Sequence, residues 1–323
     1  MASRMSAYKT ELNERYWAYQ ASQYPTWQHF FDHPRKPGLR PPVFRVRESW
    51  RNVLFAPDAT KREIDRVLAL VPDPERHKWF RSMNSSQALA QSILGNLAVR
   101  GFLDRLAEIP DDDGRPLFGD AAVSADNFAM EFKLDYLREP RPTSLDGYLE
   151  GETRVAIECK FTEPEVGTCS RPRLRPGSSN YGTEHCDGTY TLQRGRHARC
   201  SLAEIGVLYW QYIPELFKWK GDQDLCPCPV RLNYQLVRNI LAAGANPDGE
   251  VSRTGGHVLL IYDERNPAFQ SNVRGHRAFT ETRNALCQPL MLRKCSWQRI
   301  TRHMRQEDIL PCLTEQLSRK YGL

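Results

Sequence analysis

The stretch SLDGYLEGETRVAIECKFTE, residues 144–163, decides how this chain is expected to fold. Apolar residues occupy every second position in its latter half, which is the period of a strand: Val155, Ile157, Cys159 and Phe161. A second strand is expected over 143–149, and the sequence Glu150-Gly151-Glu152 between the two segments predicts a turn. The stretch therefore predicts a hairpin.

Three ionisable side chains project from this hairpin. The strand period places Glu158 and Lys160 together, opposite the apolar residues of their strand. On the preceding strand, Asp146 is expected to point away from the face that holds Leu145 and Leu149. The hairpin can therefore set Asp146 beside Glu158 on one side of a sheet, where burial is costly unless the charges pair or bind a cation.

The functional interpretation of these residues is a hard-metal site. Mg²⁺ binds oxygen ligands and keeps several waters, so one or two carboxylates suffice. In this interpretation Asp146, Glu158 and the backbone carbonyl of Cys159 hold the ion. Lys160 orients or helps to deprotonate the attacking water, or stabilises a phosphorane. The alternative is an ordinary hairpin with Glu158 and Lys160 exposed to solvent. The spacing alone favours this alternative, because a tetrapeptide of the form Ile-Glu-x-Lys, here residues 157–160, often arises by chance.

The flanking segments predict an α/β protein. A helix begins at Ser85 or Ser86 and runs to about Val99, and a strand follows over 128–136. After the hairpin, a capping-box pattern over 201–204 predicts one helix, and 230–243 predicts another. The continuously apolar run 257–262 is typical of a strand covered on both faces. The expected order is helix, three strands, helix, strand, with one additional helix before the last strand.

This arrangement resembles the PD-(D/E)XK nuclease superfamily. Asp146, followed on the next strand by Glu158-Cys159-Lys160, matches its motif, although Leu145 stands where the superfamily name has a proline. The strings 144–163 and SSQALAQSILGNL, residues 85–97, are similar to a bacterial restriction-endonuclease-like branch.

The resemblance covers about residues 77–265 and implies a fold. That fold is a restriction-endonuclease-like core: a mixed central sheet flanked by helices in αβββαβ order, with helical N- and C-terminal additions. The expected parts are an N-terminal helical arm (1–76), the nuclease-like core (77–265) and a C-terminal extension packed on it (266–323).

The resemblance also implies an activity: metal-dependent hydrolysis of phosphodiester bonds, in DNA, in a restriction or defence role. Asp146, Glu158 and Lys160 would be catalytic, with Mg²⁺ or Mn²⁺ as cofactor. Restriction-type enzymes often dimerise to cut both strands, so a homodimer is allowed. The rival interpretations are a catalytically inactive nucleic-acid-binding protein that keeps the fold, and a partner-binding protein in which Glu158 and Lys160 are incidental.

Three polar residues are second-rank candidates for the site. Glu131 lies on the polar face of the first strand and can join the metal, or it is simply solvated. Gln91, one helical turn after Gln87, can face the site or cap backbone groups nearby. Glu163 follows the lysine and can bind a second cation or pair with an arginine.

Basic residues concentrate after the hairpin. The net charge of +6 is a mild excess, but a Pro- and Gly-rich stretch carries a cluster that predicts phosphate contacts: Arg171, Arg173, Arg175, Arg194 and Arg196. A merely solvated surface is the alternative.

Nine cysteines form an odd set without a repeating framework. Cys226-Pro-Cys228 together with Cys186, Cys200 or His185 could form a zinc or iron–sulfur site, but the pair lacks the usual two-residue gap, and separate thiols are favoured. The N-terminus lacks the apolar core of a secretory signal, and no apolar run is long enough for a bilayer. A cytoplasmic protein without membrane contact is therefore expected.

Overall fold

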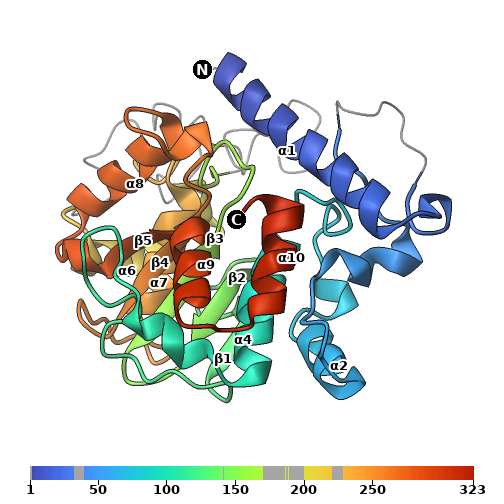
Figure 1. Cartoon of the computed structure of the whole chain (residues 1–323). Helices are drawn as coiled ribbons and strands as arrows, with labels where there is room; N and C mark the ends of the chain where they lie inside the picture. Colours follow the sequence, from blue (N-terminus) through green and yellow to red (C-terminus); the bar gives the residue numbers. More distant parts are fainter. Residues whose placement is uncertain are drawn as a thin grey trace.

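A five-stranded mixed sheet forms the centre of the structure, a computed structural model (Figure 1). The structure describes residues 2–32, 40–140, 142–169, 186, 188, 200–219 and 228–323. The strands lie in chain order: β1 (Phe128–Leu134), β2 (Thr143–Leu149), β3 (Arg154–Cys159), β4 (Gly256–Tyr262) and β5 (Leu292–Ser296). The first three are antiparallel to one another, and β3, β4 and β5 are parallel. The predicted α/β class with a mixed sheet is confirmed.

The predicted hairpin is β2 followed by β3, with Leu149 paired to Val155 and Gly147 paired to Ile157. The strand expected over 257–262 is β4. The fifth strand was not predicted, because LRKCS is short and carries two basic residues in place of an apolar alternation. The segment forms a strand because it pairs with β4, and this pairing cannot be inferred from its own residue pattern.

A helix of three segments precedes the sheet. It consists of α3 (Ser86–Ala90), a π-helical turn (Gln91–Gly95) and α4 (Asn96–Arg100). Ser85 caps its start by accepting a hydrogen bond from Ala88 N, and Gly101 ends it in a left-handed conformation with φ 75°. The shorter α2 (Lys61–Ala69) begins at a complete capping box of Thr60 and Glu63.

Between β3 and β4, the residues that the structure describes form three α-helices. The capping box predicted at Ser201 is wrong, because Cys200 is the N-cap residue and Ser201 already lies inside α5 (Ser201–Glu204). This helix is a single turn, and α6 (Tyr209–Leu216) follows after a break. The helix expected over 230–243 is α7 (Tyr234–Gly244).

Helices cover both faces of the sheet. On one face, which we name the first core, Val155 and Ile157 pack with α1 (Ala2–Gln23), α3, α4, α9 (Trp297–Gln306) and α10 (Pro311–Tyr321). On the other face, the second core, Ala156 and Leu260 pack with α6, α7 and α8 (Arg274–Ala285). In Figure 1, α9 and α10 lie in front of the strands. Burial on both sides explains why β4 is continuously apolar.

The first core joins the two ends of the chain to the sheet. Tyr16 of α1 meets Tyr321 of α10 edge to face, with ring centroids 6.2 Å apart, and Tyr321 meets Phe161 at 5.5 Å. Residues from all three predicted parts of the chain therefore share one core. None of the described helices has the length and apolarity needed to span a membrane.

Candidate active site

Asp146 and Glu158 lie across from each other on β2 and β3. The register that pairs Gly147 with Ile157 places them opposite when it is continued by one residue. The ladder of paired residues ends at Gly147 and Ile157, and beyond it Cys159 N donates a 2.6 Å hydrogen bond to Asp146 Oδ2. The two acids that the sequence singled out are therefore neighbours on one face of the sheet.

The strand pair β1–β2 is irregular at this point. The ladder pairs Met130 with Gly147 and Phe132 with Leu145 but skips Glu131 and Asp146. Glu131 has a φ of 49°, a left-handed conformation that costs a non-glycine residue on the order of 1–3 kcal/mol and is frequent at functional sites.

This break changes which core the side chains enter. Phe128 and Met130 pack in the first core, whereas Leu134, although in phase with them, packs in the second. The same shift separates Leu145, in the second core, from Leu149, in the first. The expectation that Leu145 and Leu149 share a face is therefore wrong, because the strand period of β2 is interrupted at Asp146, opposite the strained Glu131 of β1.

Glu158 and Lys160 form a buried ion pair beneath α7. They are 2% and 6% exposed, and Lys160 Nζ lies 2.6 Å from Glu158 Oε1. Lys160 Nζ also donates to Gln235 Oε1 at 3.0 Å. The other carboxylate oxygen, Glu158 Oε2, accepts from Asn239 Nδ2 at 2.7 Å and lies 3.7 Å from a guanidinium nitrogen of Arg238. The alternative of a solvent-exposed hairpin does not occur.

The polar side chains of α7 were missed by the sequence reasoning. Gln235, Arg238 and Asn239 follow the i, i+3, i+4 spacing of one helical face in the segment YQLVRNILAAG, which is otherwise mostly apolar. A polar stripe on a helix that is buried against a sheet needs partners inside the protein. That stripe was the available signal for a helix that faces the site.

Glu131 joins the site through two hydrogen bonds of 2.6 Å. Its carboxylate oxygens accept from Gln87 Nε2 and from Ser144 Oγ. Gln87 is fixed in turn by His77 N, which donates to its Oε1 at 2.9 Å. The N-terminal helix of the predicted core is thereby tied to the acid on β1.

Of the other two second-rank residues, Glu163 lies beside the site and Gln91 points away from it. Glu163 accepts from Ser86 Oγ and from Phe161 N, each at 2.6 Å, so it fixes the segment after Lys160 to the start of α3. Gln91 is fully buried, and its Nε2 donates to Val67 O at 2.8 Å. Gln91 therefore points to the end of α2 and not to the acids. Of its two interpretations, the capping of nearby backbone groups is the one observed.

The charges of the site are unevenly matched. Burial, then the nearby Glu158 and Glu131 carboxylates, raise the pKa of Asp146 well above its ordinary value. Burial also raises the pKa of Glu131. Burial also acts to raise the pKa of Glu158, but the positive charges of Lys160 and Arg238 outweigh the effect of burial. The pKa of Glu158 is therefore below its ordinary value. If all three carboxyls were ionised, three negative charges would face the two positive charges of Lys160 and Arg238, and a bound cation would balance them.

The Glu158 carboxylate also determines the charge of Lys160. Burial disfavours the ammonium form, but the adjacent Glu158 carboxylate more than compensates and raises the pKa of Lys160 above its ordinary value. Lys160 is thus a cation here, with two of its three N–H groups donated to Glu158 and Gln235.

The donor set fits a hard divalent cation. Asp146 Oδ1 has no protein donor among the described residues, and Glu158 supplies a second carboxylate on the same face. These oxygen ligands suit Mg²⁺ or Mn²⁺, and a divalent charge would offset the excess negative charge of the cluster. Within the described part of the chain, no group of three or more His, Cys, Asp or Glu side chains is placed so that it could hold a metal ion, so these two acids would bind it together with water.

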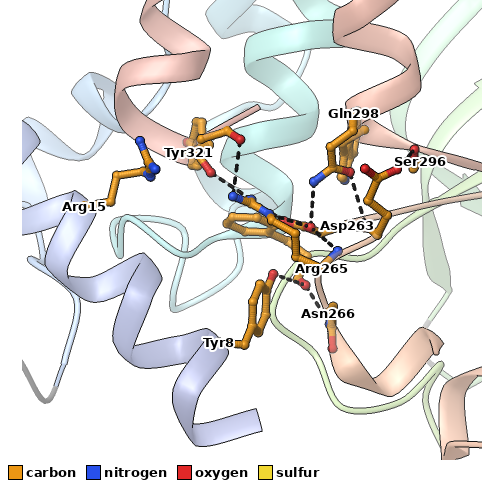
Figure 2. A network of polar contacts seen from close by, with 12 residues as sticks. Tyr8, Arg15, Asp263, Arg265, Asn266, Ser296, Gln298 and Tyr321 are labelled. Carbon is orange, nitrogen blue, oxygen red and sulfur yellow. Dashed lines mark hydrogen bonds and ion pairs between the residues drawn. The ribbon is translucent and has the colours of Figure 1, made fainter. Parts of the chain in front are cut away.

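The backbone that follows β3 accepts hydrogen bonds from side chains of the N-terminal and C-terminal parts of the chain (Figure 2). Trp297 Nε1 donates to Lys160 O at 3.1 Å, and Tyr8 Oη donates to Phe161 O at 3.1 Å. Asn266 Nδ2 donates to Phe161 O at 2.7 Å and to Glu163 O at 2.9 Å. The position of Lys160 thus depends on α1 and α9 as well as on the sheet.

The fold and site define an α/β protein whose mixed sheet presents two acids and a lysine side by side. Residues 18–322 match the family described as Restriction Endonuclease associating with ARP, and the chain belongs to that family. No curated protein and no solved structure matches the chain. The predicted class, a nuclease of restriction-endonuclease type, agrees with this family. The basic residues Arg171, Arg173, Arg175, Arg194 and Arg196 lie outside the described residues.

Proposed function

We propose that this protein is a metal-dependent nuclease of the PD-(D/E)XK superfamily that hydrolyses phosphodiester bonds in DNA. The observation that carries the proposal is the meeting of Asp146, Glu158 and Lys160 on two adjacent strands, with Asp146 Oδ1 left open. The membership in a restriction-endonuclease family supports the same reaction.

Each residue of the site has a distinct role in this proposal. Asp146 and Glu158, with the backbone carbonyl of Cys159, would hold Mg²⁺ or Mn²⁺, which when bound makes a water acidic and offsets charge on the phosphate. Lys160 keeps one N–H beyond those given to Glu158 and Gln235. As a cation it orients the water and stabilises the developing negative charge, a role that suits its raised pKa better than proton abstraction.

Substrate would approach from the side of the half-buried residues. Glu158 and Lys160 form the floor of the site, whereas Asp146, Glu131 and Ser144 are only partly buried. A phosphate therefore meets Asp146 first. The backbone hydrogen bond from Cys159 to Asp146 fixes the direction of that carboxylate before substrate arrives.

The partner in this proposal is DNA, with the basic segment 171–196 supplying phosphate contacts. Two copies of the chain would act together to cut both strands. Light scattering of the purified protein with and without a DNA duplex measures whether a second copy is recruited.

The experiment that tests the function is a cleavage assay. Plasmid and single-stranded DNA are incubated with the wild-type chain and with Lys160→Ala, in Mg²⁺, Mn²⁺ or EDTA. We expect cleavage by wild type that requires the metal, and none by Lys160→Ala. Arg66→Ala, which changes an exposed basic residue on α2, is the control and should cut at the wild-type rate. DNA binding without any metal-dependent cleavage would instead favour an inactive binding protein.

A further inference from the structure

Four cysteines from distant parts of the chain line one small cavity beside the second core. They are Cys169, Cys186, Cys200 and Cys228, and the cavity that they enclose has a volume of about 10 Å³. A space of this size holds about one water molecule. The sequence separates the first of these residues from the last by 59 positions, so only the folded chain brings them together.

Backbone hydrogen bonds connect three of the four cysteine segments. Cys228 N donates to Gly188 O at 3.0 Å, which links Cys228 to the segment of Cys186. Cys169 N donates to Arg231 O at 2.9 Å, and Arg231 N donates back to Cys228 O at 3.2 Å. The cysteines are thus held at their positions by the backbone and not by their own packing alone.

Two of the sulfur atoms receive backbone N–H groups. Gly188 N donates to Cys186 Sγ at 3.3 Å. The backbone N–H groups of Ala203 and Leu202, at the start of α5, donate hydrogen bonds to the sulfur of Cys200. N–H groups directed at sulfur stabilise a thiolate, the form in which cysteine binds metals. Arg231 adds a positive charge to the cavity wall.

We propose that Cys169, Cys186, Cys200 and Cys228 bind one Zn²⁺ ion in a structural site. Four cysteine side chains around a cavity of about 10 Å³ supply the sulfur ligands that structural zinc prefers, and this volume is too small for an iron–sulfur cluster. Hard cations such as Mg²⁺ prefer oxygen ligands and would not compete. Among the described residues, no group of three or more His, Cys, Asp or Glu side chains is placed so that it could hold a metal ion as it stands. Zinc binding would therefore require the four sulfurs to move toward one another, with release of their thiol protons.

The site would connect the parts of the chain that flank the proposed active site. Cys169 and Cys200 bracket residues 170–199, which include the basic residues expected to contact phosphate. Cys228 lies just before α7, whose Gln235 and Asn239 hold Lys160 and Glu158. Zinc would therefore shorten the effective loop between β3 and α7 and stabilise the placement of that helix.

The test is the metal content of the full-length chain, purified without chelators and measured by mass spectrometry of the elements. We expect one zinc per chain in wild type, at least about tenfold less in Cys200→Ser, and wild-type content in Cys312→Ser, which changes an exposed cysteine on α10. Because Cys200→Ser can fail to fold, wild-type apo chain is also titrated with Co²⁺, which should give the absorption bands of a tetrahedral thiolate complex.

Several outcomes would overturn the zinc site. They are a folded wild-type chain that takes up neither zinc nor cobalt, full zinc content in Cys200→Ser, and an iron chromophore in the purified protein. None of these readouts requires nuclease activity. The variant Lys160→Ala should keep its zinc whether or not the wild-type chain cuts DNA.

Discussion

Asp146 and Asp263 are carboxylates on the same sheet with opposite surroundings. Asp263, 0% exposed at the end of β4, accepts two hydrogen bonds of 3.0 and 2.6 Å from the Arg265 guanidinium and one of 2.7 Å from Gln298 (Figure 2). Asp146 accepts one from Cys159 N and faces the carboxylates of Glu158 and Glu131. A carboxylate whose charge and hydrogen bonds are matched by protein partners, such as Asp263, stabilises the fold. A carboxylate beside other acids, such as Asp146, lacks a counter-charge that a cation could supply.

The largest effect is expected at Asp146. Replacing it with asparagine keeps the shape of the site but removes the charge that would bind the metal, so cleavage should fall by about 1000-fold or more. Thermal unfolding should show no loss of stability, because the change also removes repulsion with Glu158 and Glu131. Wild-type cleavage rates in the variant would place the metal elsewhere.

At Asp263 the same kind of change should act on stability. Asp263→Ala leaves Arg265 without its carboxylate partner, and we expect a loss of about 3 kcal/mol in the free energy of unfolding, measured with urea. Asp126→Ala, at an exposed position before β1, should be neutral. If Asp263→Ala unfolds like wild type, the network in Figure 2 contributes little to the fold.

A smaller, mixed effect is expected at Asn239, which serves the active site from α7. Asn239→Leu removes a donor from the buried Glu158 carboxylate. Stability should fall by about 1–2 kcal/mol, and cleavage by about tenfold, because Glu158 is less well oriented. The cleavage rate and the urea midpoint should be measured on the same preparation. A change in stability without a change in rate would limit Asn239 to a structural role.

The smallest effect concerns pH and a buried histidine away from both acids. Burial, then the charge of Arg293, lower the pKa of His257 from 6.5 to about 3. The unfolded chain takes up a proton below about pH 6.5 and the folded chain does not, so stability is lost as pH falls, by at most about 1.4 kcal/mol per pH unit. His257→Gln, which can still donate to Leu117 O, should lose about 1 kcal/mol less than wild type between pH 6.5 and 5.5. Equal losses would mean that His257 is protonated in the folded chain.

The sequence predicted those parts of the fold that depend on local patterns. The apolar alternation in β3 and the helix start at Ser85 depend on neighbouring residues, and both predictions are confirmed. It missed β5, whose five residues form a strand because β4 lies beside them. It also misplaced Leu145 relative to Leu149, because the pairing of β1 with β2 is interrupted at Glu131 and Asp146.

The sequence also predicted the part of the candidate site that depends on a local pattern. Glu158 and Lys160 lie two residues apart, so their common face follows from the strand period alone. Their partners on α7 come from more than 70 residues away. The cavity cysteines belong to four separate segments, and without the usual two-residue gap the sequence favoured separate thiols.

The measurement that tests the central claim most directly is divalent-ion binding at the acids. Mn²⁺ is titrated into the wild-type chain, Asp146→Asn and Asp263→Asn, and the unbound ion is followed by electron paramagnetic resonance. We predict that wild type and folded Asp263→Asn bind Mn²⁺, and that Asp146→Asn binds it at least about tenfold more weakly. Undiminished binding by Asp146→Asn would contradict the assignment of the acids on β2 and β3 as the metal site.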